Sequence, residues 1–82
     1  MSERAAVREV VAAALADAGD LAPIGDSDSL VVTGRLTSID VVNIVVALED
    51  RFGVEVHADE FDPMRFDSVD AIVELLAEVK GR

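Results

Sequence analysis

The sequence has no cysteine, tryptophan or tyrosine, and its only aromatic residues are three phenylalanines. Without cysteine, the 82-residue chain can form neither a disulfide nor a thiolate metal site, and any thiol chemistry would need an attached group. The core must therefore consist of Val, Leu, Ile and Ala. Because hydrophobic residues make up 51% of the chain, we expect one domain, residues 1–82, around one small core.

Basic residues are also scarce: seven lysines and arginines stand against seventeen acids, a net charge of −10. This balance argues against a nucleic-acid partner, because phosphate binding needs a basic face. An acidic surface instead suits basic patches on partner proteins. The chain also lacks a basic, cleavable leader pattern and any apolar run of membrane-spanning length. We therefore expect a soluble, monomeric cytoplasmic protein that does not insert into membranes.

Apolar residues at helical spacing predict three longer helices. The first begins after a capping Ser2 and ends at Gly19. The second covers about Ser38–Phe52, and the third begins near Ser68. The segment 59–62, closed by a proline, has room for at most one helical turn. The residues expected to face the core from the first and third helices are Val7, Val10, Val11, Ala14, Leu15, Ala18, Val69, Ile72, Val73, Leu76 and Val79.

A long loop, residues 20–36, separates the first two helices and is rich in Gly, Pro, Asp and Ser. Loops of this length are often functional. The apolar residues expected to pin it are Leu21, Ile24, Leu30 and Leu36. The predicted fold is all-α: a small four-helix bundle of three longer helices and one short helix, with the long loop between the first and second helices.

One serine, Ser38, stands at the start of the second predicted helix. Thr37 and Asp40 form a capping box, T-x-x-D, around it. The β-branched run that follows would also suit a strand, but the cap and Gly53 at the far end favour a helix. A phosphodiester on Ser38 would gain about 0.3–1 kcal/mol from the helix dipole and the unpaired N–H groups. The position is thus compatible with a covalently attached anionic group.

The order of elements and the segment GRLTSIDVVNIVVALEDRFGVEV, residues 34–56, resemble the acyl carrier proteins. That family attaches 4′-phosphopantetheine to a serine in an Asp-Ser-Leu motif at the start of its second helix. Residues 28–30 match the motif literally and residues 67–69 nearly so, but both are out of register. The family places a Phe-Gly pair fourteen residues after the serine, and counting back from Phe52 gives Ser38. The resemblance therefore implies that Ser38 carries the phosphopantetheine.

The resemblance further implies a carrier that is not an enzyme. The arm would hold acyl intermediates as thioesters and deliver them to partner enzymes at high effective concentration. The implied partners are a phosphopantetheinyl transferase and acyl-loading and acyl-transferring enzymes of fatty-acid biosynthesis or other lipid metabolism. The residues expected to dock partners are Thr37, Ile39, Asp40, Asn43, Glu49 and Asp50. Candidates to line an acyl pocket are Val42, Val46, Leu48 and Phe61, for which an ordinary core role is an equal alternative.

Two departures from the family pattern bear on the choice of partners. Thr37 replaces the aspartate before the serine, which keeps a capping oxygen but removes a charge, and Asn43 stands where members often carry glutamate. We therefore hypothesise a dedicated lipid or secondary-metabolite pathway. The alternatives are an aminoacyl or peptidyl carrier, suggested by a D-alanyl-like segment at residues 33–36, and an unmodified helical adaptor, suggested by Thr37. No metal is expected, because His57 is the only histidine, so it has neither a second histidine at metal-ligand spacing nor a cysteine partner.

Overall fold

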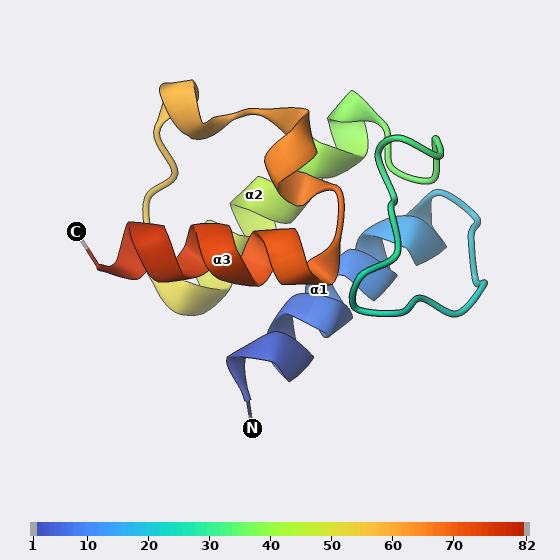
Figure 1. The fold of residues 1–82 in the computed structure, drawn as a ribbon, viewed down its shortest axis with the longest axis horizontal. Helices are drawn as coiled ribbons and strands as arrows, with labels where there is room; N and C mark the ends of the chain where they lie inside the picture. Colours follow the sequence, from blue (N-terminus) through green and yellow to red (C-terminus); the bar gives the residue numbers. More distant parts are fainter. Residues whose placement is uncertain (1, 82) are drawn as a thin grey trace.

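The computed structural model describes residues 2–81, which form three α-helices and two short 3₁₀ turns without any strand in that range. The elements are α1 (Glu3–Asp17), α2 (Ser38–Phe52), η1 (Ala58–Glu60), η2 (Pro63–Phe66) and α3 (Val69–Lys80). Figure 1 shows α3 crossing in front of α2, with the long loop beyond one end of α1. The all-α prediction is confirmed. No helix among the described residues combines the length and apolar character needed to cross a bilayer.

The fourth helix of the predicted bundle is not confirmed. Two 3₁₀ turns occupy its place, and Pro63 begins the second of them instead of closing the first. Proline suits a first helical position because its missing N–H would have no partner there. The Asp62 side chain caps this turn by accepting the N–H of Met64 at 3.0 Å. The interruption leaves two segments of three and four residues, lengths typical of 3₁₀ structure.

The ends of the α-helices follow the local signals in the sequence. Ser2 and Ser68 each accept a backbone N–H of the first turn, at 3.1 Å, at the starts of α1 and α3. At the end of α2, Gly53 takes a left-handed conformation with a φ of 64°, which costs glycine little because it has no Cβ. These caps fix α2 to the residues that the sequence predicted.

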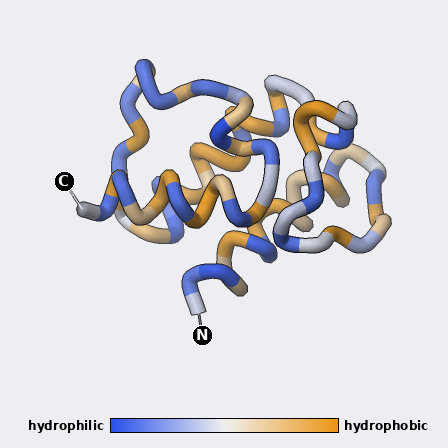
Figure 2. The backbone as a smooth tube through the Cα atoms, viewed as in Figure 1, coloured by the Kyte–Doolittle hydropathy of each residue, from blue (hydrophilic) through white to orange (hydrophobic). Residues whose placement is uncertain are grey.

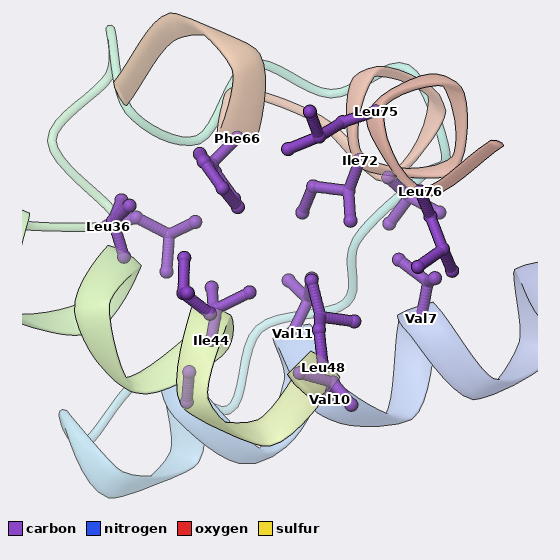
Figure 3. Packing of buried hydrophobic residues seen from close by; sticks show 14 of the residues in the cluster. Val7, Val10, Val11, Leu36, Ile44, Leu48, Phe66, Ile72, Leu75 and Leu76 are labelled. Atoms are coloured by element: carbon purple, nitrogen blue, oxygen red, sulfur yellow. The ribbon is translucent and has the colours of Figure 1, made fainter. Parts of the chain in front are cut away.

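The core lies where the three helices meet, around the fully buried Phe66 of η2. Figure 3 shows Phe66 pointing between Leu36, Ile44 and Leu75, while Val7 of α1 approaches Leu76 of α3. Figure 2 shows the corresponding alternation of apolar and polar residues along the helices. One phenylalanine and many aliphatic side chains therefore build the interior.

One residue of the predicted core, Ala18, is wrong, and one buried residue, Leu75, was missed. Ala18 is exposed because α1 ends at Asp17 and Ala18 is already its C-cap. Leu75 was not predicted to face inward, yet it is 1% exposed, and the predicted Val73 is half-buried and packs against the core. The inward face of α3 is therefore wider than the sequence pattern predicted, and both α1 and η2 contact this helix.

The loop between α1 and α2 is pinned by fewer apolar residues than predicted. Leu30 and Leu36 are buried and Ile24 is half-buried, but Leu21 is 84% exposed and anchors nothing. The backbone N–H of Leu36 donates to the carbonyl of Leu30 at 2.9 Å, which closes the segment just before α2. Polar contacts hold the rest of the loop.

Candidate functional site

The start of α2 is organised by the predicted capping box. The Thr37 hydroxyl accepts the N–H of Asp40 at 3.3 Å, and the Asp40 carboxylate accepts the N–H of Thr37 at 2.9 Å. The same Asp40 oxygen, Oδ2, also accepts the Thr37 hydroxyl at 3.0 Å. Asp40 is half-buried in this arrangement. Its negative charge therefore lies at the positive end of the helix dipole, which is a stabilising position, and only part of its side chain is open to solvent.

Ser38 occupies the first position of α2 and is exposed. Within residues 2–81 its hydroxyl makes no hydrogen bond, and the N–H groups of Ser38 and Ile39 have no acceptor. Unpaired N–H groups at a helix start favour a nearby anion. An exposed hydroxyl beside such groups fits a phosphodiester, so Ser38 could hold a phosphopantetheine arm.

The other serines differ from Ser38 in their surroundings. Ser2 and Ser68 are helix caps. Ser29, which carries the literal motif, is half-buried and donates its hydroxyl to Asp67 Oδ2 at 2.7 Å. Ser27 is exposed, but it lies in a turn of the loop, away from any helix start. Among the serines of residues 2–81, Ser38 is the one that combines exposure, a helix N-terminus and a hydroxyl without a hydrogen-bond partner, since the exposed Ser2 hydroxyl accepts the N–H of Ala5.

Asp67, just before α3, clamps the loop that leads to Ser38. Its Oδ1 accepts the N–H groups of Val31 at 2.8 Å and Val32 at 3.0 Å, and its backbone carbonyl accepts the N–H of Leu30 at 2.6 Å. The hydrogen bond from Val32, with those from Ser29 and Val31, lowers the pKa of Asp67 below its usual value. Sequence reasoning missed this role because Asp67 is 35 residues or more from its partners.

Arg35 forms a second clamp on the loop. Its guanidinium contacts both carboxylate oxygens of Asp20, at 2.8 and 3.2 Å, and donates to the Ala22 carbonyl at 3.0 Å. The paired hydrogen bonds lower the pKa of Asp20 and raise that of Arg35. Arg35 is therefore occupied within the chain, although the sequence alone would leave it as positive charge beside the site.

A third polar cluster ties the loop to the first and third helices. Arg4 Nη1 lies 3.2 Å from Asp26 Oδ2. Asp26 also forms an ion pair with Arg8, and Arg4 forms one with Asp70 of α3. The Arg8 contact lowers the pKa of Asp26, and the Asp70 contact raises the pKa of Arg4. These exposed pairs orient the loop more than they add stability.

The predicted docking residues divide into three groups: residues engaged in hydrogen bonds, an exposed apolar residue and exposed polar residues. In the first group, Thr37 and Asp40 belong to the cap, and Glu49 accepts the backbone N–H of Val56 at 3.0 Å. Ile39 is 73% exposed. Asn43 and Asp50 are exposed and line a groove between α2 and α1. The acids of α2 are therefore less available to partners than their number in the sequence implied.

The predicted pocket-lining residues do not share one environment. Leu48 is buried in the core, whereas Val42, Val46 and Phe61 are 47, 58 and 39% exposed. Ile39, Val42 and Val46 lie at spacings of three and four residues, so they form one exposed apolar stripe along α2. Met64 of η2 is also exposed, at 53%, and sequence reasoning did not single it out.

His57 is exposed, and it stands at the start of η1. The structure brings possible ligand atoms of His57, Asp59 and Glu60 within 4.8 Å of one another, whereas the expectation of no metal rested on the lack of histidine and cysteine partners alone. One Glu60 oxygen accepts the N–H of His57 at 3.0 Å, so part of this cluster serves to close the 3₁₀ turn.

Comparison with known proteins identifies the family. The model of the phosphopantetheine attachment site family matches residues 5–76, a range that includes all three α-helices except the ends of α1 and α3. No curated protein matches the chain. Members of this family are non-catalytic carriers that interact with phosphopantetheinyl transferases and acyl-handling enzymes. The chain therefore belongs to the phosphopantetheine attachment site family, and it is a carrier of covalently bound 4′-phosphopantetheine.

Proposed function

We propose that residues 1–82 form one acyl carrier domain and that Ser38 is its attachment residue. The observation that carries this proposal is the exposed Ser38 hydroxyl at the capped start of α2, while Ser29 is bonded to Asp67. The attached group supplies a thiol that holds acyl cargo as a thioester on a flexible arm. The chain's own part is to present the attachment point, favour its phosphodiester through the helix N-terminus, and dock partners.

Intact mass spectrometry after incubation with coenzyme A and a broad-specificity transferase tests the attachment residue. We expect a gain of about 340 Da for the wild type and for Ser29→Ala, and no gain for Ser38→Ala. Ser29→Ala is the matched control because it changes the serine of the literal motif. A gain that survives in Ser38→Ala would overturn the assignment, and no gain in any protein would favour the unmodified adaptor.

We also propose that the carrier serves a dedicated set of enzymes. Asn43 is uncharged, and Asp40 and Glu49 each accept a backbone N–H. Asp50 is therefore the one exposed acid of α2 without such a bond within residues 2–81. The apolar stripe of Ile39, Val42 and Val46 is exposed along the same helix. This supports docking through apolar contacts more than through steering by acids.

Loading by general fatty-acid synthase components provides the test. We expect these components to load and elongate chains on this carrier at least about 5-fold less efficiently than on their own carrier, because the charge pairs lost on docking to this carrier are worth about 1 kcal/mol or more in total. Equal efficiency on the two carriers would contradict the proposal.

A further inference from the structure

A groove between α1 and α2 is separate from the residues that present Ser38. Its volume is about 400 Å³. Its apolar lining consists of Val10, Ala13, Ala14, Ile44 and Ala47. Val10, Ala14 and Ile44 are buried, whereas Ala13 is exposed and Ala47 half-buried. Small side chains at the opening allow another polypeptide to approach the backbones of both helices.

The rim of the groove is acidic. It carries Glu9 and Asp17 from α1 and Asp50 from α2, against one cation, Arg51. Arg51 is already paired with Glu9 at 2.5 Å. Asp17 and Asp50 are exposed and form no ion pair within residues 2–81, so the rim has negative charge to offer a ligand.

The groove lies on the opposite side of α2 from Ser38. Ala47 follows Ser38 by nine residues, which is about two and a half helical turns. The two side chains therefore project in roughly opposite directions from the helix axis. A molecule in the groove would leave the attachment residue uncovered.

We propose that this groove docks a basic amphipathic helix of a partner protein. One apolar side chain of that helix enters between Ala13 and Ala47, and flanking lysines or arginines meet Asp17 and Asp50. The groove between two packed helices suits the helix-in-groove mode of recognition. Because Ser38 stays uncovered, the carrier is tethered through this face while an enzyme acts at the other. This inference goes beyond the carrier function and does not require Ser38 to be modified.

Fluorescence anisotropy with a labelled peptide tests the groove. The probe is a helical peptide of about 15 residues with leucines on one face and lysines on its flanks. Exchange of both rim acids, Asp17→Lys with Asp50→Lys, should weaken binding at least 10-fold, because two attractive charge pairs with the peptide become repulsive. Ala13→Leu fills the groove without changing the charge, and it should also weaken binding.

The matched control exchanges two acids outside the groove, Asp59→Lys with Glu74→Lys. Both residues are exposed, and the change in net charge is the same as in the rim variant. We expect binding to fall less than about 3-fold here, because only long-range attraction changes. Equal losses in the two double variants, or unchanged binding by Ala13→Leu, would overturn the proposal. Circular dichroism verifies that each variant keeps its helices.

Backbone NMR of the wild type locates the bound peptide. Amide shifts should change at Val10, Ile44 and Ala47 and stay constant at Ser38 and Ile39. Changes centred on Ser38 and Ile39 would place the peptide on the other face and overturn the proposal. Neither measurement uses the phosphopantetheine, so failure of the Ser38 assignment would leave this test intact.

Discussion

At the level of single residues, hydrogen bonding separates serines that look alike in the sequence. Ser29 lies in the better literal motif, but its hydroxyl donates to Asp67 at 2.7 Å. Ser38 is exposed and follows a threonine whose hydroxyl and backbone are both used by the cap. The free hydroxyl of Ser38 therefore supports the proposal that the phosphopantetheine is attached there.

Asp67 offers a test of the clamp on the loop. Asp67→Ala should lower the free energy of unfolding by about 1–3 kcal/mol, because a charged acceptor of several hydrogen bonds is lost. Asp67→Asn keeps the size and one acceptor oxygen, so we expect a smaller loss. Urea denaturation at neutral pH measures both.

The pH dependence of the same variants follows from the lowered pKa of Asp67. A carboxylate whose pKa is lower in the folded state stabilises fully above its unfolded pKa of about 3.9, and this contribution is lost as the pH falls through the folded value. The stability difference between the wild type and Asp67→Asn should therefore be largest near neutral pH and shrink below about pH 4. A difference that grows on acidification would contradict the clamp.

At the level of elements, α2 is helical although its sequence is rich in valine and isoleucine. β-branched residues lower helix propensity only slightly, so the capping box at Thr37 and the left-handed Gly53 decide where this helix begins and ends. Its buried residues, Val41, Ile44, Val45 and Leu48, then make it part of the core. Packing of this face, not propensity, holds the helix that presents Ser38.

Thr37 tests the start of that helix. Thr37→Ala removes the capping oxygen and should cost about 1 kcal/mol in the free energy of unfolding. Thr37→Asp restores a capping oxygen and should recover most of the loss. Thermal unfolding followed by circular dichroism compares the three proteins. If Thr37→Ala were as stable as the wild type, the capping box would not stabilise α2.

At the level of the whole molecule, three helices and one loop enclose a core that depends on a single large side chain. Phe66 comes from a 3₁₀ turn, yet it is fully buried against α2 and α3. A domain of this size has a small core, and its net stability is a few kcal/mol above the unfolded chain.

Phe66→Ala should therefore remove most of the stability of the fold, since truncation of a buried phenylalanine costs about 3–5 kcal/mol. Phe66→Leu fills more of the space and should cost clearly less. Urea denaturation measures both. Equal midpoints for the wild type and Phe66→Ala would show that the core does not rest on this residue.

The helices and their caps could be predicted from the sequence, because these features depend on neighbouring residues. The bounds of α2, the capping box of Thr37 with Asp40 and the serine cap of α3 all follow from short-range spacing. The segment between α2 and α3 was less predictable, because Pro63 can end one turn or begin the next. The location in the cytoplasm and the monomeric state stay predictions.

The sequence by itself determined the helical fold and the register of Ser38, because helical period, caps and the spacing to Phe52 are local. Only the tertiary structure decided which polar groups are free: Asp67 engages Ser29 across 38 residues, and Arg35 engages Asp20 across 15. The groove between α1 and α2 likewise exists only once the two helices pack together. Contacts between distant residues depend on how the elements fold onto one core, and no short-range pattern encodes them.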